Sequence, residues 1–129
     1  MAAKATTKVT PAMQRGTDLE PAARAAYEDQ TSLVMQPLVL EDGAYSARLD
    51  GMTLPGDLIL EIKCPIRGAR SDLWQDVAAG KVPENYMVQI QHQLMMSGAE
   101  TAHLWREEIR VSIVKYVLGG TVVINKPYR

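Results

Sequence analysis

The sequence is short of cysteine, of long apolar runs and of excess positive charge, and each shortage excludes a class of protein. The one cysteine, Cys64, excludes an internal disulfide bond and a four-cysteine iron–sulfur cluster. No apolar run approaches the roughly 20 residues that a membrane helix needs. The first ten residues also lack the hydrophobic block of a secretory signal. We therefore expect no membrane partner, no iron–sulfur cluster and a location in a reducing cytoplasm.

The charge balance is nearly neutral, with 14 lysines and arginines against 15 aspartates and glutamates and a net charge of -1. Nucleic-acid-binding domains are often basic, so this balance argues mildly against one. A metal-dependent nuclease nevertheless concentrates acids at its site, where bound cations reverse the local sign. DNA affinity would then rest on a local basic cluster, for which Arg67, Arg70 and Lys81 are the candidates.

The two histidines do not indicate a zinc site. His92 and His103 have no cysteine or histidine partner at zinc-ligand spacing. We expect both to be structural or solvated.

The length of 129 residues suits one domain that buries about two-thirds of its unfolded surface. Hydrophobic residues make up 47% and charged residues 22%, which is ordinary for a globular protein. We expect residues 1–12 to form a disordered arm and residues 13–129 to form a single domain. Internal repeats and low-complexity segments are absent from the sequence.

Two long helices are predicted. Thr17 and Glu20 have the spacing of a capping box and Pro21 suits a first turn, so the first helix should begin near Thr17. The second should span residues 85–97 and end at Gly98. Its apolar stripe consists of Met87, Ile90 and Leu94.

Strand-like segments surround these helices. Residues 32–40 read as a strand in which Pro37 predicts an edge position or a bulge. A short helix is expected at residues 72–79. The closing strands are expected at residues 102–105, 109–118 and 121–124.

A hairpin at residues 45–65 carries the most informative charges. Two apolar runs flank the turn Leu54-Pro55-Gly56-Asp57 and should pair with each other. Asp50 ends the first run, while Glu61 and Lys63 lie two apart in the second and so share one face of the strand. Buried charges are costly unless they are paired or bound to a metal. Two carboxylates and a lysine suit a divalent cation with oxygen ligands, although a structural ion pair of Lys63 with Glu61 or Asp50 is equally compatible with the spacing.

Three separated strings resemble one known family. Asp50, then a ten-residue gap and Glu61-Ile62-Lys63-Cys64-Pro65, resembles the PD-(D/E)XK nuclease signature, with Leu49 in place of the usual proline. Gly16 followed four positions later by Glu20 resembles the first motif of the YqaJ-like viral recombinase and lambda-type exonuclease family. Residues 86–91, Tyr-Met-Val-Gln-Ile-Gln, resemble its last motif.

The resemblance implies a restriction-endonuclease-like α/β (α+β) fold, a mixed β-sheet flanked by helices, for a nuclease-like domain that is either whole or a truncated core. It implies Mg²⁺, with Mn²⁺ able to substitute and no nucleotide cofactor. Asp50, Glu61 and the main-chain carbonyl of Ile62 would hold the metal, and Glu20 would serve a second position. Without the resemblance, Glu20 is better read as a helix-start acid. Lys63 would hold the attacking water, and Gln89 would orient Lys63.

The function implied is a metal-dependent DNA nuclease, a phage-type recombination exonuclease that hydrolyses phosphodiester bonds. The alternative is a catalytically inactive or truncated phage-derived remnant that acts as a DNA-binding or structural module. The expected partners are DNA, a phage single-strand annealing protein and further copies of the chain. The expected setting is the bacterial cytoplasm, with the protein encoded by a phage or prophage.

Overall fold

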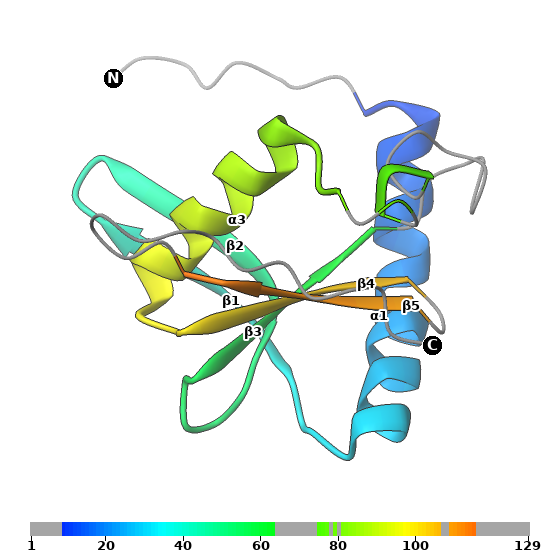
Figure 1. Cartoon of the computed structure of the whole chain (residues 1–129), viewed down its shortest axis with the longest axis horizontal. Coiled ribbons are helices and arrows are strands. Elements are labelled where there is room, and N and C mark those ends of the chain that lie inside the picture. The colour runs from blue at the N-terminus through cyan, green and yellow to red at the C-terminus, as the bar shows by residue number, and fades with distance from the viewer. Residues whose placement is uncertain (1–8, 64–74, 78, 80, 107–108, 116–129) are drawn as a thin grey trace.

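The computed structural model describes residues 9–63, 75–77, 79, 81–106 and 109–115. They form one five-stranded sheet in the order β1-β2-β3-β4-β5, with two long helices (Figure 1). The elements are α1 (Pro11–Thr31), β1 (Gln36–Asp42), β2 (Tyr45–Met52), β3 (Leu58–Ile62), α3 (Glu84–Ser97), β4 (Thr101–Arg106) and β5 (Ile109–Val114). β3 and β4 are parallel and every other neighbouring pair is antiparallel. The predicted mixed sheet with flanking helices is therefore confirmed.

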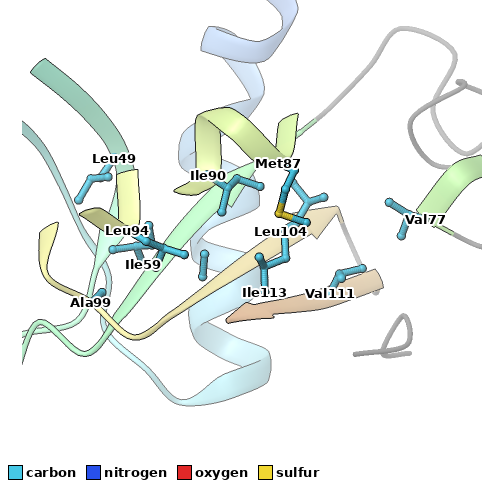
Figure 2. Packing of buried hydrophobic residues seen from close by; sticks show 11 residues of the cluster. Leu49, Ile59, Val77, Met87, Ile90, Leu94, Ala99, Leu104, Val111 and Ile113 are labelled. Atoms are coloured by element: carbon cyan, nitrogen blue, oxygen red, sulfur yellow. The ribbon is translucent and has the colours of Figure 1, made fainter. Parts of the chain in front are cut away.

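The sheet has a helix on each face. Successive side chains of a strand point to opposite sides, so neighbouring residues of one strand pack against different helices. On β3, Ile59 packs with α3 and Leu60 packs with α1. The core on the α3 side joins Met87, Ile90 and Leu94 to side chains of β2, β3, β4 and β5, as Figure 2 shows. The smaller core on the α1 side consists of Tyr27, Met35, Leu60 and Trp105.

Helix α1 begins earlier than the sequence predicted. Thr10 is the N-cap, where its hydroxyl accepts a hydrogen bond from the Met13 amide at 3.2 Å, and Pro11 occupies the first turn. A threonine followed by a proline gives a start signal here as good as the one at Thr17, and the earlier signal is the one used. Pro21 consequently lies inside the helix. Residues 11 and 12, expected in the arm, are helical.

Helix α3 matches its prediction closely. It ends at Ser97, and Gly98 adopts the left-handed conformation with φ of 75° that favours glycine at a helix end. The predicted stripe of Met87, Ile90 and Leu94 is buried. Of the short helix expected at residues 72–79, residues 75–77 are helical and most of the rest lies outside the described ranges.

The predicted hairpin forms, and β2 contains a β-bulge at its functional end. Gln36 pairs with Met52 and Leu38 pairs with Leu49, so two steps along β1 match three along β2. The extra residue falls around Asp50 and Gly51, opposite the proline that the sequence marked for an edge or a bulge. Such bulges re-aim side chains near functional sites. The strand expected at residues 121–124 lies outside the described residues.

Both histidines have structural partners, as expected. His92 Nε2 lies 3.0 Å from the Ser46 carbonyl, and His103 Nδ1 lies 2.6 Å from the Tyr27 hydroxyl. Burial lowers the pKa of His103 to about 4, which keeps its ring neutral. Within the described ranges, no helix is both long and apolar enough to cross a membrane.

Replacing Gly51 by alanine should destabilise the fold by about 1–3 kcal/mol through overpacking. An added Cβ would lie 2.7 Å from the Met35 Cβ, and both atoms are attached directly to the main chain. Gly16→Ala is the matched control, because its added Cβ meets nothing within 4 Å and alanine favours a helix interior by about 1 kcal/mol. Urea unfolding of both variants measures the difference, and equal stabilities would contradict this account of the bulge.

Candidate active site

Glu61 and Lys63 lie on the α3 side of the sheet, as the two-residue spacing predicted. The Lys63 ammonium is 3.1 Å from Glu61 Oε1 and 4.7 Å from the centre of the Tyr86 ring. Gln89 lies beside both, with its amide oxygen 3.4 Å from Lys63 Nζ and its amide nitrogen 3.4 Å from Glu61 Oε1. The ion pair that the sequence left open therefore forms, and it faces a pocket.

Gln93 holds the other oxygen of Glu61, which sequence reasoning missed. Its amide nitrogen donates to Glu61 Oε2 at 2.9 Å and to the Arg48 carbonyl at 3.1 Å. Both partners are acceptors, so the amide orientation follows from the contacts. Gln93 is buried next to the apolar stripe of α3. It lies one helical turn after Gln89 and so on the same face of the helix, and this spacing is the sequence signal that could have identified it.

Asp50 is fixed by the main chain of β3. The last paired residues of the two strands are Gly51 and Leu60, and beyond them the Asp50 carboxylate accepts a hydrogen bond from the Ile62 amide at 2.7 Å. The side chain thus replaces a main-chain partner in the ladder. The contact uses the Ile62 nitrogen, whereas the Ile62 carbonyl remains a predicted metal ligand.

Glu20 reaches the same place from α1, between two arginines that sequence reasoning also missed. Arg24 binds one Glu20 oxygen and also donates from Nε to the Asp50 carbonyl at 2.8 Å. Arg48 binds the other Glu20 oxygen at 2.5 Å, and its second nitrogen lies 3.8 Å from Asp50 Oδ1. Spacing identifies both arginines, since Arg24 is one helical turn after Glu20 and Arg48 is two residues before Asp50.

The clustered acids shift each other's protonation. Burial and the charge of Glu61 raise the pKa of Asp50 to about 7, against a lowering by the Ile62 amide. Burial alone would raise the pKa of Glu20, but hydrogen bonds with Asp50 and Arg48 bring it below its ordinary value. Asp50 is therefore the acid of the group that retains a proton near neutral pH.

A cavity of about 470 Å³ opens onto these groups. Ala12, Met13, Gly16 and Thr17 of α1 form one wall, and Tyr86 and Gln89 of α3 form another. Glu20, Arg48, Asp50, Glu61, Ile62 and Lys63 complete the lining. This volume lies within the range of small-molecule and cofactor sites.

Asp50 and Glu61 fit a divalent cation. Both are buried carboxylates, and burial together with the charge of Glu61 raises the pKa of Asp50. A divalent cation with oxygen ligands would favour the ionised form of both. Glu20 is held by its arginines instead, and no three Asp, Glu, His or Cys side chains in the described part of the chain converge as metal ligands. The donor set thus supports a metal on Asp50 and Glu61, with Glu20 beside it.

The structure brings five predicted residues together, and it places Lys81 away from them. Glu20, Asp50, Glu61, Lys63 and Gln89 all line the pocket. Lys81 is exposed and does not line it. Arg67 and Arg70 lie outside the described residues.

Solved structures with the same fold are exonucleases. An alkaline exonuclease from Laribacter hongkongensis, LHK-Exo, matches with a TM-score of 0.64 and 24% identity over 95% of this chain and 60% of that chain. Its complex with dAMP matches with the same score and identity over 92% and 58% of the two chains. A phage related exonuclease from Haemophilus somnus 129PT matches with a TM-score of 0.60 and 19% identity over 76% of this chain and 45% of that chain. The present chain thus spans about 60% of the length of the first of these proteins.

The family follows from the sequence. Residues 1–100 match the model of the YqaJ-like viral recombinase domain, and this stretch includes every pocket-lining residue. The chain therefore belongs to the YqaJ-like viral recombinase domain family. No curated protein matches the sequence.

In the metal-free protein, the contribution of Asp50 to stability should fall as the pH rises from about 4 to about 7. The folded chain holds the Asp50 proton more tightly than the unfolded chain, in which the ordinary pKa is 3.8, so this stabilisation is complete below pH 3.8 and is lost through about pH 7. Asp50→Asn keeps an oxygen for the Ile62 amide and removes the ionisation. With a chelator present, it should be more stable than the wild type by up to about 4 kcal/mol at pH 8 and nearly equal at pH 4.

Asp42→Asn is the control for this measurement, because Asp42 is an exposed carboxylate on β1. Urea unfolding at both pH values provides the comparison. A gain at pH 8 that is equally large at pH 4, or that Asp42→Asn shares, would assign the effect to something other than the Asp50 proton.

Proposed function

We propose that this chain is a metal-dependent DNA nuclease of the phage recombination type, which hydrolyses phosphodiester bonds in the pocket between α1 and α3. The observation that carries the proposal is the meeting of Asp50, Glu61 and Lys63 at one open site. Two acids next to a lysine are costly to bury and contribute little to folding. The proposal explains why a chain of this family keeps them there.

Asp50 and Glu61 would hold Mg²⁺, or Mn²⁺ in its place, with the Ile62 carbonyl as a further ligand and Glu20 at or beside a second position. Bound there, the metal would supply Lewis acidity and lower the pKa of the attacking water. The protein contributes rigidity. The Ile62 amide fixes Asp50, and Gln93 fixes Glu61.

Lys63 is the group that would face the reacting phosphate. Its ammonium contacts Glu61 and the Tyr86 ring at the pocket wall, and 21% of the Lys63 side chain is exposed. From there it would hold the attacking water and stabilise the negative charge that develops on the phosphate oxygens. Gln89, hydrogen-bonded to both Lys63 and Glu61, would fix the position of the lysine relative to Glu61, the proposed metal ligand.

DNA is the proposed substrate, and cleavage from an end is the proposed mode. The structures with the same fold are described as exonucleases, and one of them binds dAMP. A deoxynucleoside monophosphate is the kind of product that stepwise hydrolysis of DNA releases. The pocket of about 470 Å³ offers room for one such nucleotide beside the acids.

Lys63→Ala should lower the rate of DNA cleavage by at least about 10²–10³-fold, as expected for removing one charge-stabilising donor, while the fold persists. The measurement is release of nucleotides from end-labelled duplex DNA with Mg²⁺. Lys115→Ala is the control, since Lys115 follows β5 and does not line the pocket. An unchanged rate in Lys63→Ala would contradict the catalytic role assigned to Lys63.

Calorimetric titration of Mn²⁺ separates binding from catalysis. The wild type should bind the metal, and the double variant Asp50→Asn/Glu61→Gln should bind it at least about 100-fold more weakly, because both proposed carboxylate ligands lose their charge. Glu84→Gln, an exposed acid at the start of α3, controls for net charge. Metal-independent DNA binding without cleavage would instead support a DNA-binding module on the same fold.

A further inference from the structure

Arg48 occupies the space between two acids of the site. One of its nitrogens lies 2.5 Å from Glu20 Oε1, and the other lies 3.8 Å from Asp50 Oδ1. The remaining oxygens of these acids point elsewhere, since Glu20 Oε2 binds Arg24 and Asp50 Oδ2 binds the Ile62 amide. The guanidinium therefore contacts one oxygen of each acid.

The two arginines at Glu20 differ in how firmly they are held. Arg24 is largely covered, with 14% of its side chain exposed, and its Nε is bonded to the Asp50 carbonyl. Arg48 is 63% exposed, and its two ion pairs in the described part of the chain are those with Glu20 and Asp50. Arg24 is built into the scaffold, whereas Arg48 can leave without uncovering any core.

We propose that in the metal-free protein Arg48 holds the place of the second cation, between Glu20 and Asp50, and that it swings out to bind a DNA phosphate when this cation is bound. This inference rests on the proposed function and adds a residue to it. The ligand that Arg48 takes in its second position is a phosphodiester oxygen at the rim of the pocket, which Arg48 lines.

The exchange follows from the strength of the competing contacts. An exposed ion pair contributes little, because water screens it and both side chains lose freedom. Two carboxylates hold a divalent cation more strongly, and the cation then repels the guanidinium. A planar guanidinium matches two phosphate oxygens, so the released arginine has a suitable partner as soon as DNA arrives.

Removing Arg48 should therefore tighten metal binding and weaken DNA binding. Mn²⁺ is titrated calorimetrically into DNA-free wild type and Arg48→Gln, and the variant should bind the metal about 5- to 10-fold more tightly. Duplex DNA binding is then measured by fluorescence anisotropy in Ca²⁺. The variant should bind about 10-fold more weakly, and the slope of log affinity against log salt should fall by about 1.

Arg15→Gln is the matched control, because it removes the same charge from an exposed position of α1 outside the pocket. It should change both affinities by less than about 2-fold. Arg48→Lys is the second variant and should fall between wild type and Arg48→Gln in both measurements, since an ammonium cannot span two oxygens in the plane of a guanidinium. Thermal unfolding checks that every variant is folded.

The outcomes separate this inference from the proposed function. Metal affinity in Arg48→Gln that is unchanged or weaker than in Arg15→Gln would overturn the place-holding role while leaving the nuclease site intact. DNA affinity that does not change would overturn the phosphate contact. Absence of metal binding in all four proteins would overturn the proposed function and this inference together.

Discussion

The hydrogen bond from the Ile62 amide to Asp50 is the contact on which the site depends. The pairing of β2 and β3 ends at Gly51 and Leu60, and a side chain continues it where main chain no longer can. The amide of Ile62, a partly buried residue, obtains the hydrogen-bond partner that it needs. In return, the carboxylate is held by a strand instead of a flexible loop, which gives the positional accuracy that metal chemistry requires.

This arrangement places the buried carboxylates of Asp50 and Glu61 and the acid of Glu20 close together. Burial and the charge of Glu61 raise the pKa of Asp50 to about 7, so that Asp50 holds a proton near neutral pH. The charge of Glu20 is compensated by ion pairs with two arginines. Glu61 forms an ion pair with Lys63 and accepts a hydrogen bond from Gln93. Each solution costs stability compared with an apolar packing of the same volume. Proteins tolerate such local conflicts mainly at functional sites, which supports the role assigned to this cluster.

Sequence reasoning succeeded where a simple period governs the structure. The two-residue period of β3 placed Glu61 and Lys63 on one face, and the helical period placed the core of α3. It failed at the start of α1, because Thr10 with Pro11 and Thr17 with Pro21 are signals of equal quality, and the helix begins at the earlier one. The residues that surround Asp50 also could not be predicted from the sequence. One extra residue in β2 changes which groups meet, and the alternation of apolar residues does not show where a bulge inserts it.

The bulge also explains how this chain accommodates Leu49 where the related signature usually has proline. Leu49 is 1% exposed, packs in the core on the α3 side and pairs with Leu38 of β1. Its main chain therefore continues the ladder, and its side chain fills the core directly before the acid. Asp50 does not depend on a stiff preceding residue, because the bulge turns it and the Ile62 amide receives it. The aspartate is positioned by the register of two strands, so the residue before it is free to serve packing.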